Sequence, residues 1–334
     1  MNDSEKIAII GKGAKFPSGD FGERFSSPVS GDEISLPITH KRKRYMSVTT
    51  PRAIRVSEYA FYDAGIDPLD KTQNIGLYAG QYGYLHPQLS EFVPTFIDTR
   101  PQTVEGAFRD AWDSAKVSPF LVTQLLSNNL TGLLSLHWGI AGDCAALVRD
   151  SLSAASTLQE AVFSLKQGAC TTALAICGGA QDDLPAQNFL RNDGEKMPVT
   201  EPEHGAAALV LKCLSQAGKD KNKVLGVIEH IFNAYDLDSL AEKISAQLAL
   251  YPDLEQVVCE FAGAGDGERF FSRLPLEDVR QSDLSVIEGA RGCPGLISVL
   301  YAALAESQEQ TGAVLAISGS ETGHYSAVII KRNL

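Results

Sequence analysis

The feature that most constrains the fold of this 334-residue chain is an internal repeat of a helix, a strand and a second strand. In the first copy, the helix begins at Ser151 and the next strand ends at Gly178, 27 positions later. In the second copy, the helix begins at Gly292 and the next strand ends at Gly319, again 27 positions later. A further apolar strand that ends in lysine follows each copy. Equal spacing of equivalent elements predicts a duplicated half.

Short apolar runs alternate with helical patterns along the whole chain, which predicts a layered α/β fold. A polar stretch at 183–201 is the expected boundary, giving an N-terminal half at 1–190 and a C-terminal half at 191–334. Residues 21–50 and 82–116 are expected to be irregular. The expected strands are 7–10, 75–79, 173–177, 206–211, 224–228, 257–260, 314–317 and 327–330, and the expected helices are 52–64, 151–166, 240–250 and 295–305.

Composition excludes several classes of function. The formal net charge of −12 argues against a nucleic-acid partner, which would need a basic face. No apolar stretch approaches the roughly 18 residues of a membrane span. The N-terminus leads into a strand without a basic segment and an apolar run, so no signal peptide is expected. These features predict a cytoplasmic protein with no membrane partner.

The six cysteines are scattered, without a CxxC pair or a metal-ligand spacing. Free, buried thiols in a reducing compartment are the expectation. No metal site and no cofactor are expected.

The segment 142–168 has the pattern of a strand, a tight turn and a helix, with Ser151 at the head of the helix. Backbone N–H groups without partners and the positive end of the helix dipole favour a nucleophile at such a place. A serine hydroxyl is far less acidic than a thiol and needs an adjacent base. Serine is also a favoured helix cap, so the pattern favours a purely structural role for Ser151.

Several segments, taken in chain order, carry a resemblance to one family. Residues 11–17 are similar to an opening Gly-x-Gly-x-x-Phe-Pro turn, and 63–67 to the Asp-Ala-Gly that ends an arginine-rich helix lead-in. Residues 125–139 are similar to the stretch before a nucleophile loop, and 204–211 to a Glu-Gly-Ala-Gly-Ala-Leu-Val-Leu strand, with His204 in place of the glutamate. Together they resemble the β-ketoacyl synthases, which are members of the thiolase-fold family.

That resemblance implies an α/β protein with the thiolase-like fold, in which two pseudo-duplicated halves form a five-layered α/β/α/β/α architecture. It also implies a dimer that pairs sheet edges and brings the nucleophile loops close to the interface. The chain is shorter than typical active members, with the clearest loss between residues 183 and 203.

The family's reaction, as the resemblance implies it, uses a cysteine thiolate and two histidines. The cysteine position falls on Ser151. The first histidine belongs to a Glu-Ala-His-Gly-Thr-Gly-Thr loop, whose match here puts Phe261 in the histidine position. The second belongs to Ser-Asn-Ile-Gly-His, whose match puts Val286 there. Phenylalanine and valine cannot transfer a proton, so these positions are degenerate and no catalytic residue is expected.

Other histidines are available as substitute bases, but a lone histidine beside a strand is more often a hydrogen-bonded structural residue. Cys144 is expected in the strand before the nucleophile position, where it would be a poor substitute for the missing thiol. The histidines available as substitute bases are His137, His204, His230 and His324.

The resemblance favours a catalytically silent ketosynthase-like subunit, similar to the chain-length factors of type II polyketide or polyene systems. Such a subunit forms a heterodimer with an active ketosynthase and helps shape its acyl-chain tunnel in fatty-acid-like biosynthesis. Chain-length factors often carry glutamine at the cysteine position, so the serine and the short length suggest a divergent branch, such as the aryl-polyene type.

Two alternatives stay open. One is an acyltransferase or starter-unit enzyme that uses Ser151 as its acyl-accepting nucleophile. The other is a homodimeric ligand-binding or scaffolding protein. Covalent acylation of Ser151 would single out the first alternative, and co-purification with a ketosynthase would exclude the second.

The expected partners are an active ketosynthase and an acyl carrier protein. Carrier proteins are usually acidic, so a chain with a charge of −12 is expected to leave most of the docking to its partner subunit. The basic run at 41–44 either contacts an acidic partner or phosphopantetheine, or is a solvated loop.

Overall fold

The computed structural model describes the chain in segments, and the structural statements below concern those residues. They are residues 6–15, 38–47, 49–82, 106, 109, 120–124, 126–149, 152–180, 204–261, 265–274, 276, 279–283, 300, 304, 312–320 and 323–332. Within them, no helix combines the length and the apolar character needed to cross a membrane.

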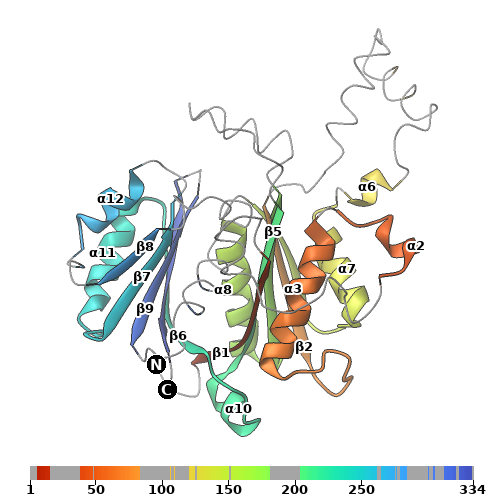
Figure 1. Ribbon diagram of the computed structural model, residues 1–334, viewed down its shortest axis with the longest axis horizontal. Coiled ribbons are helices and arrows are strands. Elements are labelled where there is room, and N and C mark those ends of the chain that lie inside the picture. The colour runs from red at the N-terminus through yellow and green to blue at the C-terminus, as the bar shows by residue number, and fades with distance from the viewer. Residues whose placement is uncertain are drawn as a thin grey trace.

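Ten strands of the described chain form one continuous, bent sheet (Figure 1). The first five are β1 (Ile7–Lys15), β2 (Ile75–Tyr82), β3 (Cys144–Arg149), β4 (Thr172–Ala180) and β5 (His204–Cys213). The second five are β6 (Gly226–Ala234), β7 (Leu254–Glu260), β8 (Arg280–Asp283), β9 (Ala313–Gly319) and β10 (Tyr325–Lys331).

The strand order is symmetric about the contact between β1 and β6. From one edge to the other it reads β3-β2-β4-β5-β1-β6-β10-β9-β7-β8, so adding five to each strand number converts the first half into the second. The directions correspond too, because β2 is parallel to β3 and β4 as β7 is to β8 and β9. β1 and β6 pair only through residues 7–9 and 226–228, beyond which each strand continues within its own half. A duplicated unit produces this arrangement.

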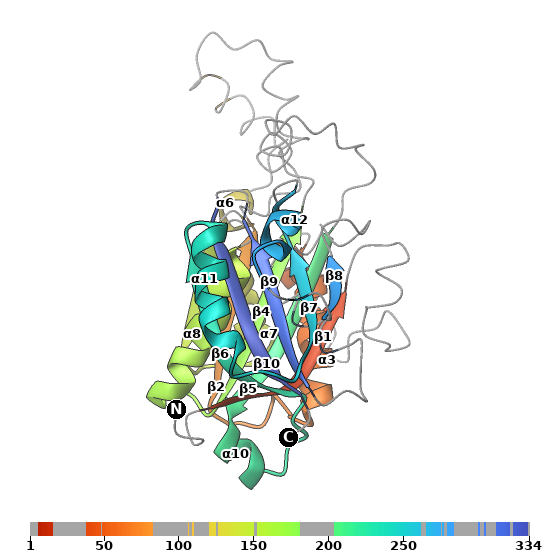
Figure 2. The ribbon, with the colours of Figure 1, turned by 90° about the vertical axis from the view of Figure 1, so that its left-hand side faces the viewer.

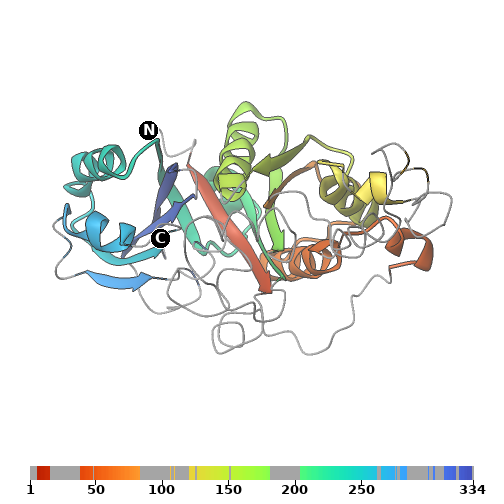
Figure 3. The same cartoon turned by 90° about the horizontal axis from the view of Figure 1, so that it is seen from above.

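Helices complete the layers. α3 and α7 cover one face of the first half-sheet, and α8 lies on its other face, between the two halves (Figures 1 and 3). α11 and α12 cover the outer face of the second half-sheet, as Figure 2 shows for α11. The expected α/β/α/β/α layering is therefore confirmed. The helices are α2 (His40–Lys43), α3 (Thr49–Ala64), α6 (Leu121–Gln124), α7 (Asn129–Trp138), α8 (Leu152–Gln167), α10 (Leu214–Lys219), α11 (Leu237–Leu248) and α12 (Asp266–Phe271).

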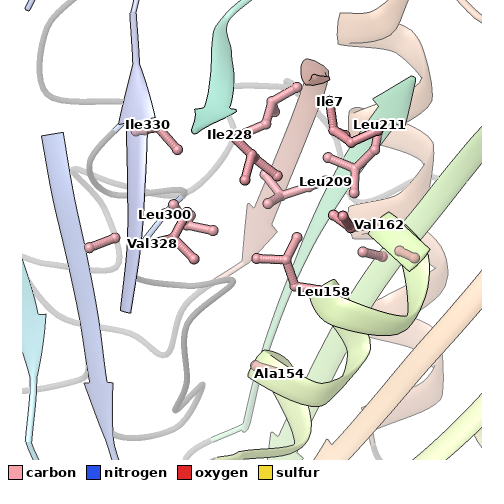
Figure 4. Close-up of a cluster of buried hydrophobic side chains, with 14 of the residues drawn as sticks. Ile7, Ala154, Leu158, Val162, Leu209, Leu211, Ile228, Leu300, Val328 and Ile330 are labelled. Atoms are coloured by element: carbon pink, nitrogen blue, oxygen red, sulfur yellow. The ribbon is translucent and has the colours of Figure 1, made fainter. Parts of the chain in front are cut away.

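The central layer is an apolar core to which both halves contribute (Figure 4). Leu158 and Val162 of α8 lie in one cluster with Leu209 of β5, Val328 of β10 and the helical residue Leu300. Full burial of such a side chain contributes about 1.5–3 kcal/mol relative to exposure. This shared core holds the two halves together.

Three sequence-based expectations differ from the structure. Residues 21–50 are predicted to be irregular, yet α2 and the first two residues of α3 lie in that stretch, and the side chain of Thr39 caps α2. The strand predicted at 224–228 extends to Ala234, because β10 continues to pair with β6 after β1 has diverged. Cys144 lies in β3 as predicted, but its thiol is exposed, because β3 forms the edge of the sheet.

None of the other described cysteines forms a disulfide: Cys170, Cys177 and Cys259 are buried, and Cys213 is partly buried. The residues of the expected half boundary at 183–201 lie outside the described ones, as does residue 293. However, β5 lies between β4 and β1, so the first half-sheet extends to Cys213 and the change to the second half falls between β5 and β6, after the expected boundary. The helix expected at 295–305 is described only at Leu300 and Leu304, which are both helical and buried.

Candidate functional site

The three positions where the family's catalytic residues are expected each follow the carboxyl end of a strand. Position 151 follows β3, Phe261 follows β7 and position 286 follows β8. Ser151 and Val286 lie outside the described residues. The site is therefore built here from the side chains that surround these strand ends, and ends of parallel strands are where α/β sheets usually bind ligands.

Ser153 fixes the first turn of α8, two residues after the nucleophile position. Its hydroxyl accepts the backbone N–H of Arg149 at 2.8 Å and donates to the backbone carbonyl of Gln81 at 2.7 Å. Ser153 is fully buried, and it therefore links the ends of β3 and β2 to the start of the helix. This link fixes the end of β3 to the start of α8.

Gly80 allows α8 to approach β2 closely at the same point. A Cβ at Gly80 would lie 2.5 Å from Thr157 Oγ1 and 2.8 Å from the carbonyl oxygen of Ser153. Thr157 also donates its hydroxyl to that carbonyl at 2.7 Å. The first half thus keeps a tightly packed, hydrogen-bonded frame around the head of α8.

Phe261, which the sequence predicts at the first histidine position, is 4% exposed. Its ring centroid lies 5.8 Å from that of Phe270 and 6.3 Å from that of Tyr325. A Cβ at Gly319 of β9 would lie 3.1 Å from Phe261 Cδ1 and 2.8 Å from Tyr325 Cε1. The space at the end of β7 is therefore filled by aromatic rings, none of which can act as a base at neutral pH.

A hydrogen bond ties this aromatic group to α12. The Tyr325 hydroxyl donates to Asp266 Oδ2 at 2.7 Å, and Asp266 is the first residue of α12. Burial and this carboxylate both raise the pKa of Tyr325. The phenol therefore stays protonated and keeps donating at neutral pH.

The opposite end of α8 is anchored by a second polar group. Asp143 Oδ2 accepts the hydroxyls of Tyr78 at 2.8 Å and Ser164 at 2.9 Å. These two hydrogen bonds lower the pKa of the Asp143 carboxyl. Because the carboxylate stays ionised, it fixes α8 to β2 and to the start of β3 at neutral pH.

The described histidines sit in structural surroundings. His137 is buried on α7 beside Trp138, and burial lowers its pKa. The rings of His230 and Tyr251 lie 5.9 Å apart, and those of His324 and Tyr235 5.0 Å apart. His204 begins β5, and its side chain is not among the described ones. No sequence pattern pointed to Ser153, Gly80, Tyr325 or Asp266, because each gains its role from a segment distant in sequence.

Two comparisons of sequence relate the chain to known proteins. Residues 32–217, more than half of the 334, match the family described as "Beta-ketoacyl synthase, N-terminal domain". An iterative polyketide synthase of Emericella nidulans is 25% identical over 271 residues. That match covers 67% of this chain and 10% of the fungal protein, so the chain spans about a tenth of that relative's length.

Solved structures are similar over almost the whole chain. A chain from the complex of a type II polyketide synthase acyl-carrier protein with its ketosynthase has a TM-score of 0.72 and 17% identity, with 98% of this chain and 99% of that one covered. A β-ketoacyl synthase from Burkholderia phymatum has a TM-score of 0.68 and 16% identity, with 98% and 100% covered. These likenesses show the thiolase-like ketosynthase fold. With the family match, the mirrored sheet and the layered halves, they establish that the chain belongs to the β-ketoacyl synthase family.

Proposed function

We propose that this chain is a non-catalytic subunit of the chain-length-factor type in a type II polyketide or polyene synthase, such as an aryl-polyene system. It pairs with an active ketosynthase and helps shape that subunit's acyl-chain tunnel. The observation that carries the proposal is Phe261, a buried aromatic side chain at the position of the family's first histidine.

The chemistry of the two strand ends supports a silent subunit. The frame around the head of α8 is retained through Ser153, so the fold does not require a reactive thiol there. A hydroxyl at position 151 needs a general base, and Phe261 cannot provide one. The features that position the helix are kept, while the group that would work with the nucleophile is replaced.

The edge strand β3 supports the pairing with a second subunit. Within the described sheet β3 has β2 on one side and no strand on the other, and Cys144 and Ala146 are exposed along it. α7 and α8 both contact β3 and present Leu136 and Phe163, which are 61% and 57% exposed. An unpaired edge beside exposed apolar side chains is suited to a subunit interface. We assign this surface to the active ketosynthase.

An acyl carrier protein is the second proposed partner. One structural neighbour belongs to a complex of a carrier protein with its ketosynthase, which is a statement about that protein. Here the charge of −12 leads us to place most of the docking on the partner subunit. Residues 41–43 of the basic run lie in α2, Arg44 is its C-cap, and Lys41 and Lys43 are exposed, so this helix carries a local positive charge on an acidic chain.

The pairing is tested by co-expressing the chain with a type II ketosynthase that retains its cysteine and both histidines, followed by native mass spectrometry. We expect a heterodimer with one copy of each chain. Phe163→Asp is expected to weaken it at least about tenfold, the effect of roughly 1.4 kcal/mol. Tyr62→Asp on α3, where Tyr62 is 82% exposed, is the matched control and should leave the association unchanged.

A homodimer that excludes the ketosynthase, or no association at all, would contradict the pairing. Intact-protein mass spectrometry after incubation with acyl-loaded carrier protein tests the silent character separately. We expect no acyl mass shift. A shift on the parent chain that Ser151→Ala abolishes would establish the acyltransferase alternative instead.

A further inference from the structure

We propose that Phe261, Phe270 and Tyr325 form an aromatic plug that excludes an acyl chain from the carboxyl ends of β7 and β9. This inference deepens the proposed function, on which it rests. It assigns the second half of the chain the role of a closed wall, so that the acyl tunnel of the pair does not enter there.

The plug is closed on the sheet side by a glycine that leaves no free space. Gly319 of β9 lies against the rings, and even a Cβ there would be 2.8 Å from Tyr325 Cε1 and 3.1 Å from Phe261 Cδ1. Real Cβ atoms do not approach other atoms as closely as 2.8 Å, so the rings already occupy the volume that a side chain would take. An acyl methylene group is as large as a Cβ methyl and is excluded for the same reason.

The plug is closed on the helix side by α12. Phe270 of α12 is fully buried against Phe261, with ring centroids 5.8 Å apart. The Tyr325 hydroxyl donates to Asp266 Oδ2 at 2.7 Å, which ties the start of the same helix to β10. Two contacts from one short helix, one apolar and one polar, therefore hold the rings in place.

The family's histidine would leave an imidazole, which is smaller and polar, in the same position. A phenyl ring fills more volume and presents only apolar atoms. The replacement thus removes a proton-transfer group and fills space at once. This combination distinguishes a closed wall from a pocket that has only lost its catalytic group.

The test uses the purified full-length chain without any ketosynthase, titrated with cis-parinaric acid, a fluorescent long-chain fatty acid. Phe261→Ala is expected to bind the probe at least about tenfold more tightly than the parent, since burial of roughly two methylene groups suffices for that factor. Phe61→Ala is the matched control, because Phe61 is equally buried but lies in the core between α3 and the first half-sheet. It should bind the probe as weakly as the parent.

Phe261→Leu provides a milder opening if the alanine variant does not fold, and its binding should lie between those of the parent and Phe261→Ala. Tyr325→Phe, which removes the tether to Asp266, should also tighten binding, by a smaller factor. The inference is overturned if neither Phe261 variant binds more tightly than the parent, or if Phe61→Ala binds as tightly as they do. Because no partner is present, failure of the subunit pairing would leave this result unaffected.

Discussion

The carboxyl ends of the parallel strands occupy equivalent positions in the two halves, but polar groups surround them in the first half and aromatic side chains in the second. Gln81 lies opposite Gly178 in the first half, and Phe261 packs against Gly319 in the second, where Gly178 and Gly319 are the corresponding glycines of the repeat. The first place is hydrogen-bonded through the Gln81 carbonyl to α8. The second is aromatic and closed. A duplicated scaffold can therefore preserve its geometry while one copy keeps a polar frame and the other fills its site.

The strongest test of this comparison is Phe261→Ala measured against Gln81→Ala. Loss of the buried phenyl ring should lower the free energy of unfolding by about 3–5 kcal/mol. Gln81→Ala should cost about 1–2 kcal/mol, because its backbone carbonyl, which makes the contact with Ser153, is retained. Urea denaturation monitored by circular dichroism gives both values. Equal losses of stability in the two variants would show that the Phe261 side chain contributes no more to packing than the Gln81 side chain does.

A second test concerns the polar frame of the first half. Ser153→Ala removes the hydroxyl that pairs with the Arg149 N–H and the Gln81 carbonyl, and leaves the partly buried N–H and the buried carbonyl without this partner. We expect a loss of about 2 kcal/mol in the free energy of unfolding. Ser156→Ala, one turn further along α8 and only partly buried, is the control and should stay within about 0.5 kcal/mol of the parent. A neutral Ser153→Ala would show that the frame does not depend on this hydroxyl.

The smallest expected effect concerns Lys12 of β1, which joins the two halves by donating its ammonium group to the Leu304 carbonyl at 2.9 Å. Burial lowers its pKa from 10.5 to about 8, an effect that nearby Asp63 partly opposes. The unfolded chain therefore holds this proton more firmly than the folded chain does. Stability should rise as the pH increases from about 8 toward 10.5, and the cost of burying the charge is fully present below pH 8.

The parent should gain about 1 kcal/mol between pH 8 and pH 9.5 relative to Lys12→Met, after allowance for the water that reaches the side chain. Raised pKa values keep Tyr78 and Tyr325 protonated through this range, so these two phenols do not mask the effect. Thermal unfolding of both proteins across the pH series provides the measurement. Parallel pH profiles would show that Lys12 titrates normally and that the junction between the halves is open to water.

Much of the fold was accessible from the sequence, because local patterns repeat at a fixed spacing. The helix after position 151, the strands around it and the duplicated order all follow from periodicity and spacing. The family motif also predicts Phe261 at the histidine position. It does not predict the surroundings of Phe261, because Gly319, Tyr325 and Asp266 reach it from segments that no local pattern connects with β7.

The sequence alone determined the layered α/β class and the repeat, since both depend only on residue type and spacing, while the family resemblance predicts phenylalanine in place of a proton-transferring residue. Only the tertiary structure decided that Cys144 is exposed, that Ser153 joins two strand ends and that Gly319 packs too closely against Phe261 and Tyr325 to carry a side chain. Exposure, hydrogen-bond partners and packing depend on which distant segments meet in space. Those meetings are fixed by the combined packing of both halves rather than by any one segment.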